Sequence, residues 1–285
     1  MRRIMLLVTL MLTALMSFPS VSFAQAQIYT RKEKLKDLTA KTVKVVLTGD
    51  EVLDESLKQS VTASWTISPF EFCSNEEFQK IKTDNKFYFL LVVKGQQRKE
   101  SEPGIDLLTL VKGGEGADKS INDMLEVVTF PLRSAVDPSG REFIFIPAFL
   151  TIMQEHAMEL TKSEVKAYTP LGGNDTKKLR MKQIYFFKED LSPQVQDKTL
   201  ESLDDDTFVK EDEEDVDDIF EKGTFNAVVS YIVAPTEPVD GSVCYKMLIG
   251  ADNHKLYWYK KHRISPRQGA GFLDSDLKAI KLIRK

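Results

Sequence analysis

One stretch of the sequence carries residue types and a spacing that could form a metal site. His156 is preceded by Glu155 and followed by Glu159, and a histidine can share a metal with a carboxylate three residues further along one helical face. His156 is also spaced by four residues from both Ile152 and Leu160, which places its imidazole within an apolar stripe. We therefore expect a buried histidine with one hydrogen-bond partner, and the metal site formed by these three side chains is the alternative.

A second candidate site lies in an acidic section, residues 189–221, which contains 15 acidic residues against Lys198 and Lys210. Asp204 and Asp206 supply carboxylate oxygens, the ligands that calcium prefers. The section lacks the alternating Asp spacing and the central glycine of an EF-hand loop. We expect a solvated, partly disordered insert, with calcium binding as the alternative.

A basic and aromatic segment follows, because the chain from residue 254 onward has nine Lys and Arg against Asp274 and Asp276. The side chains that we regard as partner-binding candidates are Lys255, Tyr257, Trp258, Tyr259, Lys260, Lys261 and Arg263. Such a mixture is typical of nucleic-acid binding in a cytoplasmic protein, but the export signal described below argues against nucleic acid. A solvated strand face, or contact with the acidic section, remains open.

No pattern in the chain predicts a cofactor or a catalytic centre. The segment 113–120, GGEGADKS, resembles a phosphate-binding loop, but a Walker loop needs glycine directly before Lys-Ser and Asp118 occupies that place. No serine lies in a G-x-S-x-G setting, and neither Cys73 nor Cys244 has a histidine near it in sequence. We expect no cofactor and no metal, and we name no catalytic residue.

The two cysteines, Cys73 and Cys244, are compatible with a disulfide in an oxidising compartment. Each lies in or beside an apolar segment, where unpaired buried cysteines also occur. A domain of this size needs no covalent staple, so we favour two buried thiols and keep the disulfide as the alternative.

The N-terminus reads as a cleavable secretory signal over residues 1–24. Two arginines precede an almost wholly apolar run over residues 4–16, and small residues then allow cleavage before Gln25 or before Gln27. The apolar run is shorter than a spanning helix needs, and no cysteine near either site could carry a lipid anchor. We expect a periplasmic protein without a membrane span after cleavage, and an extracellular location is the alternative.

The remaining sequence, 25–285, alternates strand-like and helix-like patterns, which predicts one α/β domain. Its expected fold is a mixed β-sheet with flanking helices and a C-terminal β-hairpin followed by a closing helix. We expect helices capped by Asp50 and Ser74 and a long helix opened by Pro147. The expected strands are 42–48, 65–70, 86–94, 105–111, 183–187, 226–233, 243–249 and 255–262, and the expected closing helix is 272–283.

The order of patterns at both ends of the chain is similar to that of known envelope proteins. NAVVSYIVAP, then YKMLIGADNHKLYWYKKH, then a terminal helix resembles the end of the periplasmic α/β domains of the curli secretion lipoprotein and the penicillin-binding-protein activator lipoproteins. An apolar strand, a glycine, a helix containing LKQSV and a short strand resemble their beginning. This chain lacks the lipidation cysteine of those proteins. It also resembles uncharacterised exported proteins of anaerobic Gram-negative bacteria.

These features favour an exported, non-enzymatic binding or envelope-assembly module, with an envelope protein as partner. An unrecognised periplasmic enzyme is the first alternative, because active sites are assembled from residues far apart in sequence. A pocket that contains His156 would favour that enzyme. A calcium-dependent surface protein is the second alternative.

Overall fold

The computed structural model describes residues 30–173 and 176–284. The expected signal segment, residues 1–24, and both of its cleavage positions lie outside the described residues. No helix of the described ranges is both long enough and apolar enough to cross a membrane.

The N-terminal half of the described chain is built on a mixed five-stranded sheet in the order β2-β1-β3-β4-β5. β1 is parallel to β2 and β3, whereas β3, β4 and β5 form an antiparallel meander. The strands are β1 (Thr42–Val46), β2 (Phe70–Cys73), β3 (Phe87–Gly95), β4 (Ile105–Lys112) and β5 (Leu125–Ser134). The helices are α2 (Arg31–Leu35), η1 (Leu38–Ala40), α3 (Glu51–Ser64), α4 (Asn75–Ile81), η2 (Ile121–Asp123), α5 (Glu142–Lys162) and α6 (Glu164–Ala167).

The C-terminal half is built on a second five-stranded sheet in the order β10-β9-β8-β6-β7. β6 is parallel to β7 and β8, and β8, β9 and β10 form an antiparallel meander. The strands are β6 (Gln183–Phe187), β7 (Thr207–Lys210), β8 (Ala227–Val233), β9 (Val243–Gly250) and β10 (Leu256–Arg263). The helices are η3 (Thr176–Met181), η4 (Lys188–Asp190), α7 (Asp197–Leu200), α8 (Glu213–Glu221) and α9 (Asp274–Arg284).

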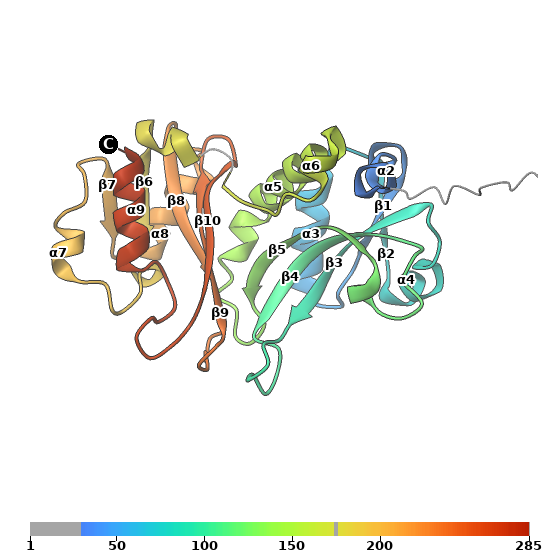
Figure 1. The fold of residues 1–285 in the computed structure, drawn as a ribbon, viewed down its shortest axis with the longest axis horizontal. Coiled ribbons are helices and arrows are strands. Elements are labelled where there is room, and N and C mark those ends of the chain that lie inside the picture. Colours follow the sequence, from blue (N-terminus) through green and yellow to red (C-terminus); the bar gives the residue numbers. More distant parts are fainter. Residues whose placement is uncertain (1–29, 174–175, 285) are drawn as a thin grey trace, which may run out of the picture. The chain divides into compact units, whose positions relative to one another are not determined.

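The two halves therefore repeat one topology, which Figure 1 shows with β1–β5 and β6–β10 as the two sheets. The first strand of each half lies between the second and the third, and the same strand pairs are parallel in both. α4 and α8 follow the second strand of their halves, and α5 and α9 close them. The α/β class expected from the sequence is confirmed, with two mixed sheets in place of one.

α5 is the central helix of the hydrophobic core. Phe149 of α5 packs against Phe130 of β5, with ring centroids 4.8 Å apart, and against Tyr231 of β8 at 5.2 Å. Phe145 stacks on Phe220 of α8 at 4.1 Å. Since these rings come from both halves, the face of the first sheet that α5 covers and the face of the second sheet that α8 covers share one core.

The opposite face of each sheet has its own core, as the period of two along a strand requires. Tyr88 and Leu90 of β3 belong to the central core, whereas Phe89 and Leu91 pack against Phe78 of α4. In the second sheet the outer face packs against α9. β3, expected to be a central strand because of its continuous apolar run, is central and buried on both faces.

A buried charge network centred on Arg141, the residue before α5, joins the two halves. Its Nε donates to Asp217 of α8 at 2.7 Å, its Nη1 to Asp190 at 3.1 Å and its Nη2 to the carbonyl of Ser230 in β8 at 3.1 Å. Asp190 also accepts a hydrogen bond from the Ser230 hydroxyl at 2.5 Å. The nearby carboxylates raise the pKa of Arg141 although burial opposes this, so the guanidinium stays charged in the core.

Each half also anchors its closing helix through a cross-strand pair of charged residues. Asp106 of β4 lies opposite Arg133 of β5, and Arg133 contacts Asp106 and Glu142 of α5, both at 3.1 Å.

The corresponding pair in the second half is Lys246 and Lys260. Both lysines bind Asp276 of α9, Lys260 at a distance of 2.8 Å. The strand pair has opposite charges in the first half and two positive charges in the second. In both halves, however, a carboxylate of the first helical turn holds the helix to the meander.

Most of the expected elements form near their expected bounds, with two local corrections. The segment 65–70 is not a strand: Trp65 ends α3, and β2 starts only at Phe70. α5 begins at Glu142, so Pro147 lies inside it. A proline there removes one helical hydrogen bond, and the burial of the apolar residues before it compensates because Phe145 is fully buried.

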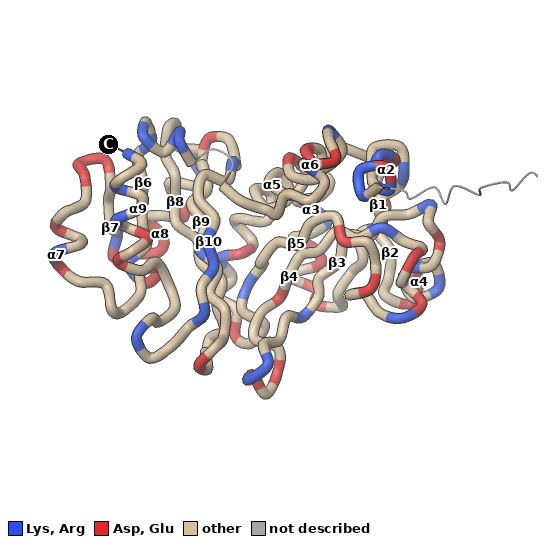
Figure 2. The backbone as a smooth tube through the Cα atoms, in the orientation of Figure 1, with Lys and Arg blue, Asp and Glu red and all other residues tan. Residues whose placement is uncertain are grey.

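The acidic section 189–221, expected to be an insert, contributes α7, strand β7 and α8 to the second half. Figure 2 shows its Asp and Glu residues along the segment that carries α7 and α8. Val216 and Phe220 of α8 are buried, because these two residues form an apolar stripe on one face of a helix that is otherwise rich in carboxylates. Strand β5 was not expected, since Pro131 interrupts its pattern, and as an edge strand it tolerates that proline.

Candidate functional site

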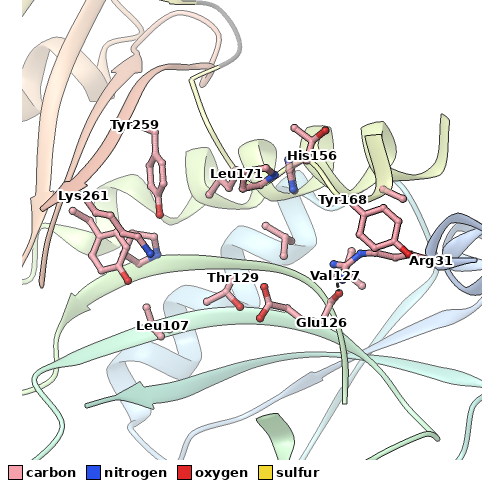
Figure 3. Close-up of a pocket in the computed structure, with 16 residues that line it drawn as sticks. Arg31, Leu107, Glu126, Val127, Thr129, His156, Tyr168, Leu171, Tyr259 and Lys261 are labelled. Atoms are coloured by element: carbon pink, nitrogen blue, oxygen red, sulfur yellow. Dashed lines mark hydrogen bonds between the residues drawn. The ribbon is translucent and has the colours of Figure 1, made fainter. Parts of the chain in front are cut away.

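A cleft between the two halves is the strongest candidate for a functional site. It has a volume of about 390 Å³, within the range of small-ligand pockets, which occur preferentially where two structural units meet. Figure 3 shows it between β5, α5 and β10. Its lining residues are Arg31, Leu107, Glu126, Val127, Val128, Thr129, Pro131, His156, Ala167, Tyr168, Thr169, Pro170, Leu171, Tyr245, Tyr259 and Lys261.

The C-terminal wall of the cleft comes from β9 and β10. Tyr259 and Lys261 are two residues apart on β10 and face the same side, while Trp258 packs in the core beneath α9. Tyr245 lies beside Tyr259, with ring centroids 6.2 Å apart. The ammonium group of Lys261 lies 5.7 Å from the centroid of the Tyr245 ring.

The opposite end of the cleft is formed by Arg31 of α2, as Figure 3 shows. Its Nη2 donates to the backbone carbonyl of Glu126 in β5 at 2.7 Å, and its guanidinium lies 6.0 Å from the ring centroid of Tyr168. Arg31 Nε is buried and has no hydrogen-bond partner among the described residues.

The cleft therefore gathers hydrogen-bond donors that have no acceptor among the described residues. Within the described part of the chain, the hydroxyls of Tyr245 and Tyr259 make no hydrogen bond, and Lys261 forms no ion pair. Burial raises the pKa of both tyrosines, so their hydroxyls stay protonated at neutral pH and can donate. Glu126 is the only carboxylate among the described lining residues.

His156 reaches the cleft from α5 and is buried, with 6% of the residue exposed. Burial and, to a smaller extent, the charge of Arg31 lower the pKa of His156, although Glu159 opposes this. The imidazole is therefore neutral at pH 7. It has one ring nitrogen that donates and one that accepts.

The structure separates His156 from the two carboxylates considered with it. Glu155 and Glu159 line a different cavity, together with Lys162, Lys166 and Lys255, and Glu159 forms ion pairs with Lys162 and Lys166. Glu155 points away because it is about 100° around α5 from His156, whereas Glu159, on a neighbouring position of the helix, is held by the two lysines.

The calcium candidates are also occupied by protein contacts. Arg284 of α9 binds Asp204 at 2.7 Å and lies 3.7 Å from Asp206, so the basic C-terminal segment contacts the acidic section here. Across residues 30–173 and 176–284, no group of three or more His, Cys, Asp or Glu side chains is arranged to hold a metal ion.

The other partner-binding candidates do not form one surface with Tyr259 and Lys261. Tyr257 is buried in the outer core of the second half, Lys260 binds Asp276, and Arg263 donates to the carbonyl of Gly241 at 3.3 Å. Lys255 lies at the cavity of Glu155. A bulge in β10 between Leu256 and Trp258 adds to this division between faces.

Cys73 and Cys244 are both free and buried. Cys73 belongs to the outer core of the first half, whereas Cys244 lies in β9 and accepts a hydrogen bond from Gly271 N. Burial raises the pKa of each thiol to about 11, so neither is a reactive thiolate at neutral pH.

Sequence reasoning missed four of the polar residues that line the cleft: Arg31, Glu126, Tyr168 and Tyr245. Three of them lie on different elements and Tyr168 directly follows α6, and no local spacing connects them. The available signal was weak, because Glu126 and Thr129 are polar positions of a strand that was not recognised.

Comparison of the chain with family models, with curated proteins and with solved structures found no match.

Proposed function

We propose that the protein is an exported, non-enzymatic binding module whose cleft takes a carboxylate-bearing segment of an envelope protein. The observation that carries this proposal is that Tyr245, Tyr259 and Lys261 present three donors without a hydrogen-bond acceptor at one end of a cleft that has a single carboxylate among its described lining residues. A carboxylate accepts hydrogen bonds only, and it would satisfy these groups.

The shape of the site supports an extended segment as the ligand. β5 is the edge strand of its sheet and lies along the cleft, and an edge strand can pair with an added chain. Apolar residues such as Leu107 and Leu171 flank the donors, so the ligand would combine an acidic group with an apolar neighbour. Export, which the N-terminal pattern predicts, would make an envelope protein the available partner.

Site-directed photocrosslinking in cells that express the full chain tests the proposal. The crosslinking residue replaces Tyr168, which is 67% exposed and lines the cleft, and in the control it replaces Phe225, which is 84% exposed and does not line it. We expect a crosslinked envelope protein at position 168 only, attached through a segment that contains Asp, Glu or a C-terminal carboxylate.

Charge reversal provides the matched control. Lys261→Glu should abolish the crosslink because it removes one of the cations of the cleft, whereas Lys80→Glu, an exposed lysine outside the cleft, should preserve it. Equal adduct yields at positions 168 and 225, or equal effects of the two substitutions, would contradict the proposal.

The second candidate is an enzyme, because a neutral His156 lines the cleft. Within the described residues, His156 makes no hydrogen bond to a Ser, Thr or Cys nucleophile. The substitution His156→Gln distinguishes the two functions: a binding module retains the crosslink at position 168, whereas an enzyme loses turnover of any substrate found by screening the purified protein.

A further inference from the structure

The repeated topology places an equivalent crevice in each half, at the edge where the parallel strands end. Ligands of open α/β sheets bind outside the carboxyl ends of the strands. In the C-terminal half this crevice lies beyond β6 and β8 and contains Asp190 and Glu213. Arg141, from the N-terminal half, enters it and binds Asp190 and Asp217.

The C-terminal crevice is thus a cation site that the protein fills itself. A guanidinium lies on two carboxylates there, and its plane is near the aromatic rings of Phe187 and Tyr231, each with its centroid 5.6 Å away. Carboxylates and aromatic faces are the groups that recognise guanidinium.

The crevice of the N-terminal half has a similar position and a volume of about 400 Å³, and the guanidinium of Arg133 lies at its edge, bound to Asp50 and Asp106. Asp50 follows β1 there as Asp190 follows β6, and Asn75 begins α4 as Glu213 begins α8. Its lining residues are Val46, Leu47, Thr48, Asp50, Leu53, Asn75, Phe78, Leu91, Val92, Lys94, Asp106, Ile121 and Arg133.

Asp106 is the residue of this crevice that lacks a full set of partners. Its side chain is 6% exposed. One oxygen accepts from Arg133 Nε at 3.1 Å, and the other, Oδ1, is buried without a hydrogen bond among the described residues. The ammonium group of Lys94 lies 4.0 Å from Oδ1, and the Lys94 side chain is 64% exposed. A buried carboxylate oxygen without a donor is uncommon and calls for a partner.

The charges around Asp106 favour a further cation. Asp50, Asp106 and Glu142 share the guanidinium of Arg133, and the ammonium group of Lys94 lies 4.0 Å from Asp106 Oδ1, so three carboxylates face two cations and one negative charge remains. The positive end of α3 does not reverse this balance, because Asp50 already accepts from the first N–H groups of that helix.

We propose that the crevice at the carboxyl ends of β1 and β3 is a binding site for a guanidinium group that Asp106 and Asp50 recognise. Arg141 in the C-terminal half is the resident example of the same interaction. The guanidinium would come from an arginine of a partner polypeptide or from a small free molecule. This site is separate from the cleft, so the proposed function and this proposal can fail independently.

Titration followed by NMR tests the site, with blocked arginine amide as the probe and blocked citrulline amide as its neutral isostere. We expect saturable shifts of the backbone amides of Thr48, Gly49 and Lys94 with the arginine probe and none with citrulline. Methylguanidinium and an arginine-containing pentapeptide form two further arms. Tighter binding of the pentapeptide would identify a polypeptide source, and equal binding would identify a small molecule.

Substitutions connect the shifts to the two carboxylates. Asp106→Asn should weaken binding about tenfold or more, because it removes a charged acceptor. Asp50→Asn should weaken it as well while it keeps the helix cap, since asparagine caps as well as aspartate. Asp205→Asn, an exposed residue of the other half, should have no effect.

Lys94→Gln distinguishes a cation from an anion as the ligand. Removal of the lysine should tighten binding of the arginine probe, because a competing cation is gone. Loss of binding in Lys94→Gln, shifts of equal size with citrulline, or unchanged affinity in both Asp50→Asn and Asp106→Asn would overturn the proposal.

Discussion

Replacement of Arg141 by methionine should destabilise the protein severely. The side chain is 4% exposed, and it makes three hydrogen bonds to Asp217, Asp190 and the Ser230 carbonyl. Methionine fills much of the volume but leaves both carboxylates without a cation. Breaking a buried ion pair from one side costs about 3–5 kcal/mol, a large share of the 5–15 kcal/mol that a typical protein has.

Urea unfolding followed by tryptophan fluorescence measures this loss, because the chain has two tryptophans. Trp65 ends α3 in the N-terminal half and Trp258 lies in β10, so Trp65→Phe and Trp258→Phe leave one reporter in each half. With a slope of about 3 kcal/mol/M, the midpoint should fall by about 1–1.7 M. The fall in the urea midpoint should be larger in the protein that keeps Trp258 as its reporter, because Asp190 and Asp217 both lie in the C-terminal half.

The loss should also depend on pH. In Arg141→Met the destabilisation should shrink as the pH falls from 7 toward 4, because burial raises the pKa of Asp217 and protonation removes its unpaired charge. Arg180→Met, at an exposed arginine, should change stability by less than about 0.5 kcal/mol. A loss below about 1 kcal/mol for Arg141→Met, or one that does not change with pH, would refute the reasoning.

Three further predictions concern buried titratable groups. Burial and, to a smaller extent, the charge of Arg31 lower the pKa of His156 below its ordinary value, so its contribution to stability is complete above the pKa of an unfolded histidine, about 6.5, and is lost as the pH falls below it. His156→Gln should flatten the dependence of unfolding free energy on pH between 7 and 5, and an unchanged slope would contradict this. Asp276→Asn should cost about 3–5 kcal/mol because it leaves Lys246 buried without a counter-charge. Urea unfolding should show a much smaller cost in a Lys246→Met background. Because the pKa of each thiol is about 11, Cys73 and Cys244 should react with a disulfide reagent at pH 8 only as the protein unfolds, and immediate labelling of the folded protein would contradict their burial.

Local patterns predicted much of the fold correctly. β6 has the expected bounds, the hairpin of β9 and β10 forms around the expected turn, and Asp50 and Ser74 cap the helices that follow them. These features depend on neighbours in sequence: a cap is satisfied within three residues, and a strand of continuous apolar residues must be buried on both faces.

The failures have a common cause, which is burial by distant residues. Pro147 was expected to open α5, but the helix extends back to Glu142 because core contacts outweigh one missing hydrogen bond. The acidic section looked like an insert, although Val216 and Phe220 give α8 a buried stripe. The sequence did not indicate the repeated topology, because two halves can have the same strand order and direction without having similar residues at equivalent positions.

The sequence by itself determined the α/β class, most strands and the positions of several caps, because these follow from the period of apolar residues and from contacts within a few residues. Only the tertiary structure decided which polar residues share a site. His156 lines a different cavity from Glu155, and it shares the cleft with Tyr259, Lys261 and Arg31. Which residues line the cleft together depends on the packing of α5 against two sheets, and no spacing along the chain predicts it.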